Sequence, residues 1–201
     1  MVTPKQQRQF AWALVAFFFA GSVLSYVDRS VLGVVMPQVR KDLALSNTQY
    51  GLAVNCFLIG YMVFYVLGGR LTDLLGSRRT FTLNILFWSV AGIAHAAARG
   101  LASLCVVRAL LGVGEGGFFP TAMRGFSEWF PRENRAKAVG VLMCGISLGM
   151  LVTPPVVAWI TLRYGWRAAF LLTGSLGFLF VPPWLWIHRR IRQAYGVPDP
   201  A

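Results

Sequence analysis

Four charged side chains lie in stretches of sequence that are otherwise almost entirely apolar. They are Asp28, Arg29, Arg108 and Glu115. Placing such a charge in hydrocarbon costs roughly 2.5–3.5 kcal/mol on insertion scales, so the group needs a partner or a function. A guanidinium binds a carboxylate through two parallel hydrogen bonds, and protonation of the carboxyl group weakens that interaction. These residue types predict a polar site that binds an anion and exchanges protons.

The spacing of these residues indicates how they are arranged. Arg108 and Glu115 are seven residues apart, which is about two helical turns, and therefore share a helix face. Asp28 and Arg29 are neighbours and point about 100° apart. We expect all four to face one cavity between the first and fourth helices. Ionised carboxylates would hold the arginines there, and protonated ones would release an arginine to an anion. The alternative is a set of buried ion pairs that only fixes helix packing.

The composition shows what kind of fold must position these charges. Of the 201 residues, 56% are hydrophobic and 13% are charged, whereas a typical globular protein has about 25% charged residues. A bilayer core of about 30 Å requires about 20 apolar residues in each helix. Six stretches qualify: 10–36, 50–71, 80–98, 101–123, 136–160 and 168–187. The sequence therefore predicts an all-α integral membrane protein with a six-helix bundle at 1–192 and a short cytoplasmic tail or linker at 193–201.

The basic residues predict how this bundle is oriented. With the N-terminus in the cytoplasm, twelve Lys and Arg residues fall on the cytoplasmic side and five on the other. The twelve are Lys5, Arg8, Arg70, Arg78, Arg79, Arg124, Arg132, Arg135, Lys137, Arg189, Arg190 and Arg192, and the five are Arg40, Lys41, Arg99, Arg163 and Arg167. This excess follows the positive-inside rule, with both termini cytoplasmic. The net charge of +12 is then explained by attraction to anionic lipid, and no nucleic-acid partner is expected.

Other reactive residues are weaker candidates. Cys56, Cys105 and Cys144 are widely spaced in apolar runs and are expected to be small packing residues. His95 lies at the outer end of the third predicted span, where an interfacial side chain is favoured over a proton relay. The sequence contains no nucleophile–base pair, metal-binding cluster or phosphate loop. We therefore expect no enzyme activity, no metal and no cofactor other than the proton as a coupling ion.

A polar segment between the second and third predicted spans carries the most specific motif. It contains Gly69, Asp73, Gly76, Arg78 and Arg79 in the order G-x-L-x-D-x-x-G-x-R-R. This pattern resembles the cytoplasmic signature of the major facilitator superfamily, a loop that takes part in gating. Other segments resemble motifs of the same family, and they are the runs 108–120, 129–136 and 165–170. The resemblance covers nearly the whole chain.

The charged residues narrow the resemblance to one branch. Asp28 and Arg29 on the first helix, with Glu115 on the fourth, resemble the anion:cation symporters, which include carriers of hexuronates and galactonate. The resemblance implies that Arg29 binds a substrate carboxylate and that Asp28 and Glu115 carry protons. It also implies that Tyr61 hydrogen-bonds the substrate and that Arg108 is the helix-four arginine of the family.

Two further polar residues have open roles. Asn55 and Tyr65 on the second span are candidates for the cavity lining. A packed or lipid-facing position explains either side chain equally well.

The length of the chain adds an expectation about its partners. Transporters of this superfamily have two six-helix halves, with the substrate bound between them near the bilayer midplane. The resemblance therefore implies the N-terminal half of a proton-coupled symporter for an organic anion such as a hexuronate, aldonate or aldarate. The expected partners are that anion, membrane lipid and a second half, which is a missing C-terminal segment, a separate chain or another copy. The short loops favour a bacterial inner membrane.

Two alternatives to this function remain open from the sequence. One is a carrier that exports drugs or metabolites in exchange for protons, because the loop signature is common to both kinds of carrier. The other is a truncated fragment that does not transport.

Overall fold

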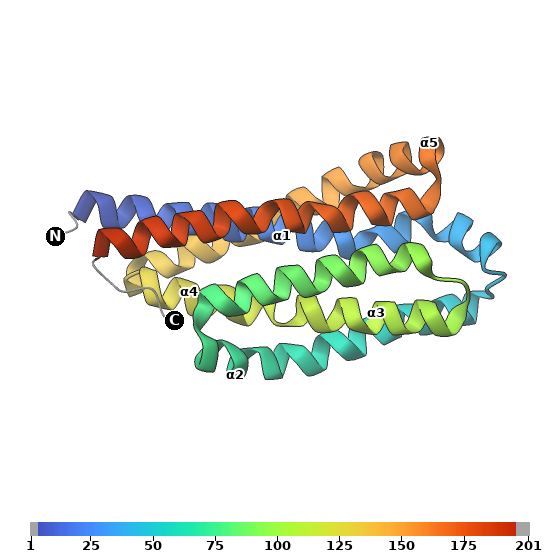
Figure 1. The fold of residues 1–201 in the computed structure, drawn as a ribbon, viewed down its shortest axis with the longest axis horizontal. Helices are drawn as coiled ribbons and strands as arrows, with labels where there is room; N and C mark the ends of the chain where they lie inside the picture. The colour runs from blue at the N-terminus through green and yellow to red at the C-terminus, as the bar shows by residue number, and fades with distance from the viewer. Residues whose placement is uncertain (1–3, 196–201) are drawn as a thin grey trace.

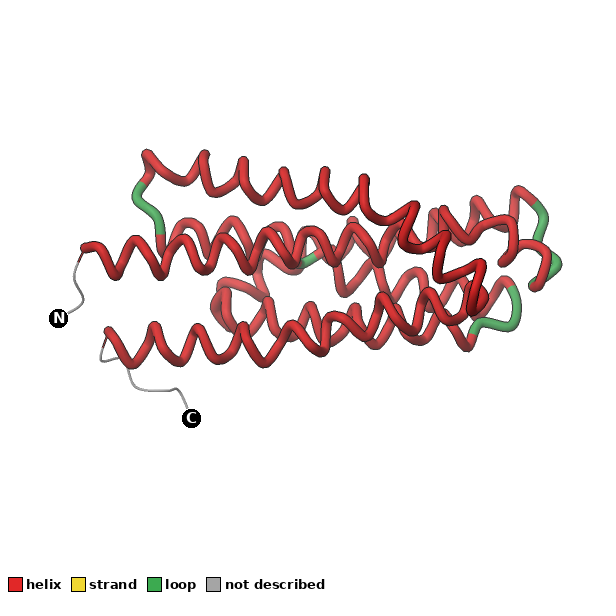
Figure 2. Tube along the Cα trace, turned by 90° about the horizontal axis from the view of Figure 1, so that it is seen from above, coloured by secondary structure: helices red, strands yellow, loops and turns green. Residues whose placement is uncertain are grey.

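The computed structural model describes residues 4–195, which form helices joined by short connections (Figure 1 and Figure 2). In chain order these are α1 (Pro4–Asp42), α2 (Asn47–Ala94), the 3-10 helix η1 (His95–Ala97), α3 (Leu101–Gly116), α4 (Phe118–Trp129) and α5 (Arg132–Tyr195). No strand occurs in this range, so the predicted all-α class is confirmed.

The two longest helices each reverse direction at a glycine. The backbone has φ 78° and ψ 160° at Gly76 in α2, and φ 80° and ψ 166° at Gly165 in α5. A positive φ carries no steric penalty for glycine, whereas a Cβ atom disfavours it. In Figure 1 both helices run along the bundle, turn and return. We therefore describe α2 as a first arm (47–75) and a second arm (77–94), and α5 as a first arm (132–164) and a second arm (166–195).

Four helical stretches of the described chain are long and apolar enough to cross a membrane, whereas the sequence predicts six spans. The numbers differ because two of the four contain the reversals at Gly76 and Gly165. The fourth predicted span runs across the break between α3 and α4 at Gly117. The predicted tail 193–201 begins inside α5, which continues to Tyr195, and residues 196–201 lie outside the described part.

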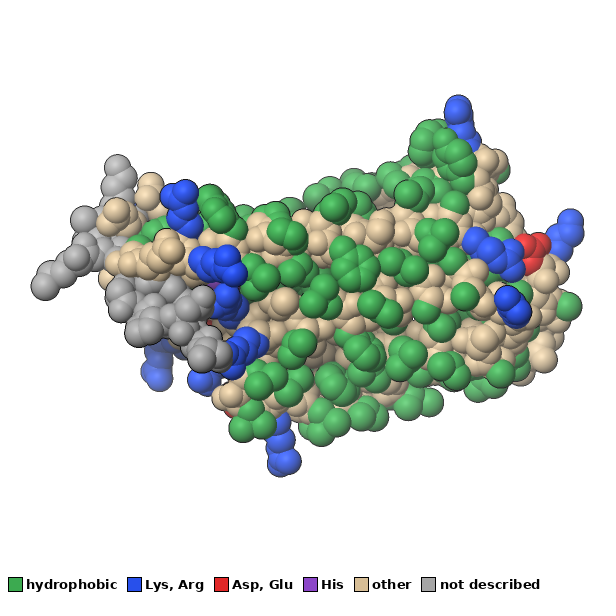
Figure 3. All heavy atoms as spheres, in the orientation of Figure 1, with side chains coloured by type: hydrophobic (Ala, Val, Ile, Leu, Met, Phe, Trp, Pro, Cys, Tyr) green, Lys and Arg blue, Asp and Glu red, His purple; other side chains and the backbone are tan. Residues whose placement is uncertain are grey.

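The two ends of the bundle collect different parts of the chain. The start of α1, the Gly76 turn, the α4–α5 connection and the end of α5 lie at one end (Figure 1). The α1–α2 connection, η1 and the Gly165 turn lie at the other. On the face drawn in Figure 3, Lys and Arg side chains gather at both ends and leave a belt of apolar side chains between them. This distribution is typical of a protein that spans a bilayer.

The interior consists of two apolar clusters separated by polar side chains. The first cluster includes the rings of Phe18, Phe81 and Trp184, whose centroids lie 4.4–5.5 Å apart. The second includes Val35 and Trp166, nearer the other end of α1. Between the two clusters, α1 presents three buried polar side chains, which are Ser22, Ser25 and Asp28. The polar residues therefore occupy the middle depth of the bundle.

Close contact between helices holds this polar layer in place. A Cβ atom on Gly60 would overlap the carbonyl oxygen of Ala109, and one on Gly112 would overlap that of Phe57. The first arm of α2 and α3 therefore touch backbone to backbone, as small residues allow in membrane helices. Gly145 of α5 makes a similar contact with α1, where a Cβ would overlap the Ser22 hydroxyl.

Candidate functional site

Glu115 lies in the last turn of α3 and is 1% exposed. Its Oε2 atom accepts hydrogen bonds from Arg29 Nε at 3.1 Å, from Arg29 Nη2 at 3.0 Å and from Ser25 Oγ at 3.1 Å. The other oxygen, Oε1, is buried and has no hydrogen-bond partner among residues 4–195. One carboxylate oxygen therefore joins α1 to α3, and the other is open to a proton or a further donor.

Arg29 extends from this buried contact to an accessible surface. Its side chain is 34% exposed, in contrast to the fully buried Glu115 side chain. The guanidinium carbon lies 4.7 Å from the ring centre of Tyr61 and 5.1 Å from that of Phe57, which are cation–π distances. The aromatic rings and Glu115 hold the guanidinium in place, while about a third of the Arg29 side chain surface stays exposed.

Arg108 is the second guanidinium of the site and is only 4% exposed. It lies 5.0 Å from the centre of the Phe57 ring, so one ring contacts both arginines. Its Nε and Nη1 atoms have no hydrogen-bond partner in the described chain. Unpaired buried donors are costly, which makes a partner outside these residues favourable. The predicted grouping of Arg29, Arg108 and Glu115 is therefore seen in the structure.

Asp28 does not join that group in the way that the sequence predicted. The expectation of one cavity between the first and fourth helices requires correction, because Asp28 faces the second arms of α2 and α5. Its Oδ1 atom lies near Gly92, and its carboxyl group lies beside Thr173. Asp28 is 3% exposed, and Oδ1 has no hydrogen-bond partner within the described residues. The two carboxyl groups therefore face different helices, although they are close enough for their charges to repel each other.

His95 is fully buried, which corrects the expectation of an interfacial side chain. Its ring stacks on Phe170 with a centroid distance of 4.7 Å and an interplanar angle of 14°. Nδ1 lies 2.7 Å from the carbonyl oxygen of Ala91, so Nδ1 carries a proton and donates it. His95 thus closes one end of the bundle by packing.

A ladder of aromatic rings continues from the arginines toward the Gly76 end. Phe57, Tyr61 and Tyr65 recur every four residues on one face of the first arm of α2. Adjacent centroids lie 5.8 Å and 6.0 Å apart, and Tyr65 stacks on Phe119 at 6.2 Å. The structure thus places Tyr61 against Arg29, and it places Tyr65 in the same ladder. Asn55 is exposed and lies outside it.

The signature segment lies around the reversal at Gly76. Asp73 Oδ1 lies 3.5 Å from Arg124 Nη1 of α4, and both side chains are at least half exposed. Glu128 also pairs with Arg124, at 3.0 Å, and accepts a hydrogen bond from Ser77 Oγ at 2.6 Å. The segment is therefore tied to α4 by charges. Three further signature residues belong to it: Gly69 has open space around it, and Arg78 and Arg79 border a groove with Glu128 and Trp129.

Three site residues were missed from the sequence. Ser25 donates to Glu115, Phe57 lies under both guanidiniums, and Thr173 lies beside Asp28. Ser25 and Phe57 each precede a predicted residue, Arg29 or Tyr61, by four positions, and this helical spacing was a usable signal. Nothing in the sequence relates Thr173 to Asp28, because the contact joins separate helices.

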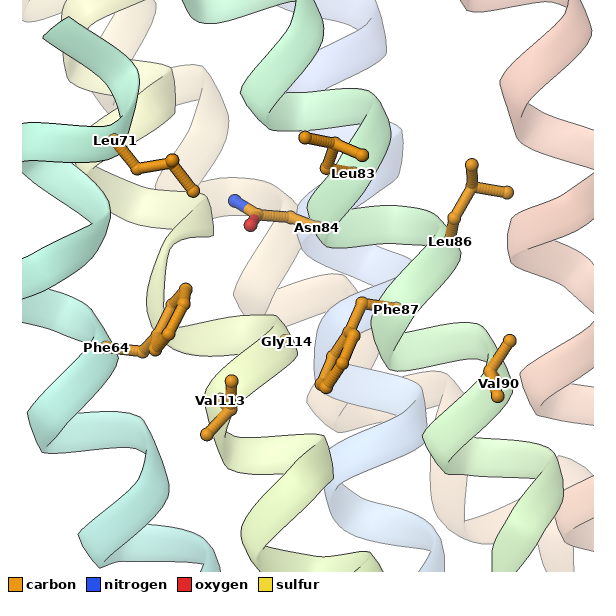
Figure 4. A pocket seen from close by; sticks show the side chains of 9 residues that line it. All are labelled: Phe64, Leu71, Leu83, Asn84, Leu86, Phe87, Val90, Val113 and Gly114. Carbon is orange, nitrogen blue, oxygen red and sulfur yellow. The ribbon is translucent and has the colours of Figure 1, made fainter. Parts of the chain in front are cut away.

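A separate groove lies between the two arms of α2 and α3 (Figure 4). It has a volume of about 430 Å³, and Asn84 supplies its one polar side chain. In Figure 4 the Asn84 amide points into the space between the helices. None of the four charged residues lines it. An anion would find no positive charge in this groove, so the candidate site remains the group around Arg29.

Comparison with known proteins identifies the family. A sequence profile of the Major Facilitator Superfamily matches residues 18–199. The chain belongs to this superfamily. Together with the long apolar helices, this membership shows that the chain is an integral membrane protein of a transporter family.

Curated relatives in this superfamily include sugar-acid carriers. The hexuronate transporter of Bacillus subtilis (strain 168) is 36% identical over 171 residues, which cover 85% of this chain and 40% of that protein. The D-galactonate transporter of Escherichia coli O6:H1 (strain CFT073) is 31% identical over 183 residues, which cover 91% of this chain and 43% of that protein. The chain therefore spans less than half the length of these relatives.

Solved structures of the superfamily have the same fold. The proton:xylose symporter bound to 6-bromo-6-deoxy-D-glucose matches with a TM-score of 0.77 at 19% identity. The match covers 96% of this chain and 46% of that one. The helices of this chain therefore have the arrangement of part of a major facilitator transporter.

Proposed function

We propose that this chain supplies the N-terminal half of a proton-coupled symporter for an organic anion, with sugar acids such as hexuronates or aldonates as the preferred class. The observation that carries the proposal is the Arg29–Glu115 contact at 3.0 Å, in which the Glu115 side chain is buried and the Arg29 side chain is partly exposed. The names of the two curated relatives, which are carriers of a hexuronate and of galactonate, support the substrate class.

The proposed mechanism is a competition between two carboxylates for one guanidinium. While Glu115 is ionised, it occupies the Nε and Nη2 donors of Arg29. A proton on Glu115 weakens these charge-assisted bonds and frees the fork of Arg29 for a substrate carboxylate. The Tyr61 ring lies against this guanidinium, and its hydroxyl group would donate a hydrogen bond to the same substrate.

The charges of the site support coupling of one anion to proton uptake. Arg29 and Arg108 balance Asp28 and Glu115 when all four are ionised. One proton on a carboxyl group leaves a net positive charge, which a bound carboxylate offsets in a poorly solvated site. Arg108, with two unpaired donor atoms, adds a second attraction for the anion. Asp28, which faces the second arms of α2 and α5, is proposed as a second proton carrier.

The proposal includes a second six-helix half and a location. Substrate sites of this kind lie at the interface of two repeats near the midplane, and the accessible side of Arg29 would face that interface. We propose that the end holding the Gly76 turn is cytoplasmic in a bacterial inner membrane, because most Lys and Arg residues lie there. Gly69, Asp73, Gly76, Arg78 and Arg79 would then form a cytoplasmic gating loop that meets the second half.

Uptake by the completed protein tests this function. The chain is joined to a C-terminal six-helix half to give the completed protein, reconstituted in vesicles and given labelled galacturonate with an inward proton gradient. We expect accumulation that Arg29→Ala abolishes, and uptake without proton-driven accumulation in Glu115→Gln. Arg163→Ala is a matched control, because Arg163 packs over Trp159 of α5 away from the site.

Undiminished galacturonate uptake in Arg29→Ala would contradict the site assignment. Transport of lipophilic cations with no uptake of any sugar acid would favour the exporter instead. The absence of any coding sequence for a further six-helix segment, together with no transport by the chain alone, would favour a fragment that does not transport.

A further inference from the structure

Two cysteines lie side by side next to the candidate site. Cys56 is in the first arm of α2 and Cys105 is in α3, and both are free and half-buried. The two thiols lie close enough for the Cys56 side chain to affect the Cys105 thiol electrostatically. Their pairing is not predictable from the sequence, because they are 49 residues apart in separate predicted spans.

The packing of the two helices explains why these thiols meet. The first arm of α2 and α3 run in the same direction, and Gly60 lies against the backbone of Ala109. Cys56 is four residues before Gly60, and Cys105 is four residues before Ala109. Each cysteine therefore lies about one turn from the closest contact and on the same side of its helix. A disulfide needs Cα atoms about 4.4–6.8 Å apart, and helices in backbone contact provide that approach.

We propose that Cys56 and Cys105 form a redox-sensitive dithiol that closes to a disulfide and clamps the first arm of α2 to α3. With an oxidant of the diazene class, one thiol adds across the N=N bond and forms an S–N bond. The sulfur of the second thiol then attacks the first sulfur. The S–S bond forms, the S–N bond breaks, and the diazene leaves as a hydrazine that carries both thiol protons. A small dithiol reverses the reaction by thiol–disulfide exchange.

The clamp would act on the residues that hold the arginines. Phe57, which contacts both guanidiniums, directly follows Cys56. Arg108 lies three residues after Cys105, so it is within one turn of the bond. An effect of oxidation on transport rests on the proposed function, whereas formation of the bond does not. The test therefore measures the bond itself.

The third cysteine provides an internal control. Cys144 is exposed on the first arm of α5, away from the other two. The purified chain in lipid nanodiscs is treated with diamide, denatured, alkylated and weighed by mass spectrometry. We expect the wild type to retain one alkylatable thiol of three, Cys144→Ala to retain none, and Cys56→Ala and Cys105→Ala to retain two each. Reduction with dithiothreitol after the diamide treatment and before alkylation should restore all thiols.

Peptide mapping of the oxidised wild type makes the result independent of how well each variant folds. The expected product is one cross-linked peptide pair that contains Cys56 and Cys105. Retention of all three thiols in the wild type would overturn the proposal. A wild-type cross-link that involves Cys144, or one that joins two chains and persists in Cys144→Ala, would also overturn it.

Discussion

Asp28 and Arg29 are neighbours in α1, yet they lie in contrasting environments. Arg29 points toward α3, pairs with Glu115 and stays 34% exposed. Asp28 points toward the second arms of α2 and α5 and is 3% exposed, and no cation contacts it among the described residues. A step of about 100° around the helix separates a compensated charge from an uncompensated one.

This contrast indicates different functions for the two carboxyl groups. Glu115 accepts two hydrogen bonds from Arg29, so in the proposed mechanism its ionised carboxylate competes with the anion for that guanidinium. Asp28 has no guanidinium to release, so a proton on it changes the charge of the bundle without freeing a binding group. We infer that Glu115 links proton and substrate, and that Asp28 acts at a distance from the substrate.

Removing Arg29 should have the largest effect on binding. Truncating one partner of a buried charge pair costs about 2–5 kcal/mol, so Arg29→Ala should weaken galacturonate binding by about 30-fold or more. Arg29→Lys keeps the charge but lacks the planar guanidinium, so its affinity for galacturonate should lie between those of the wild type and Arg29→Ala. Equilibrium binding to the completed protein measures this. Equal affinity of Arg29→Ala and the wild type would show that Arg29 does not bind the anion.

Replacing glycine by alanine should destabilise the contact of α3 with the first arm of α2, beside Arg29, more than the contact between the second arms of α2 and α5, beside Asp28. A Cβ on Gly112 would overlap the Phe57 carbonyl oxygen, whereas one on Gly92 would lie 3.3 Å from Gly174 Cα. Overpacking costs about 1–3 kcal/mol, so Gly112→Ala should lower the melting temperature clearly and Gly92→Ala less. Gly140→Ala is the control, because nothing lies near that site. A larger drop in melting temperature for Gly92→Ala than for Gly112→Ala would contradict the packing described for α2 and α3.

Neutralising Asp28 should change coupling more than binding. Asp28→Asn keeps the side-chain shape and removes a buried charge that lacks a cation, so folding stability should stay the same or rise. Galacturonate binding should stay within about threefold of wild type, which is below about 1 kcal/mol, while proton-driven accumulation falls. Binding and uptake on the same vesicles measure both. A loss of binding as large as that of Arg29→Ala would place Asp28 in the anion site.

The smallest effect is expected at the exposed ion pair of the signature loop. Asp73 and Arg124 lie 3.5 Å apart with exposed side chains, and such pairs contribute about 0.2–1 kcal/mol. Asp73→Asn should therefore leave the melting temperature of this chain nearly unchanged. A reduced transport rate at unchanged stability would indicate a gating contact with the second half. A marked loss of stability would show that the loop holds this half together.

Much of this arrangement follows from local sequence. Apolar run lengths predicted the helical class, and the spacing of Arg108 and Glu115 predicted their common face. Gly76 of the signature segment has a positive φ in the structure, a conformation that glycine adopts without steric penalty. The direction of Asp28 was not predictable, because it depends on which helices flank α1. The pairing of Cys56 with Cys105 depends in the same way on the register of two separate helices.

The most direct measurement of the Arg29–Glu115 competition is the pH dependence of galacturonate binding to Glu115→Gln in the completed protein. Glutamine has the size of glutamate but cannot ionise, so it cannot compete as an anion for Arg29. We predict that the variant binds galacturonate over the whole pH range with the affinity that the wild type reaches only after acidification. A variant that keeps the wild-type pH dependence would contradict the competition.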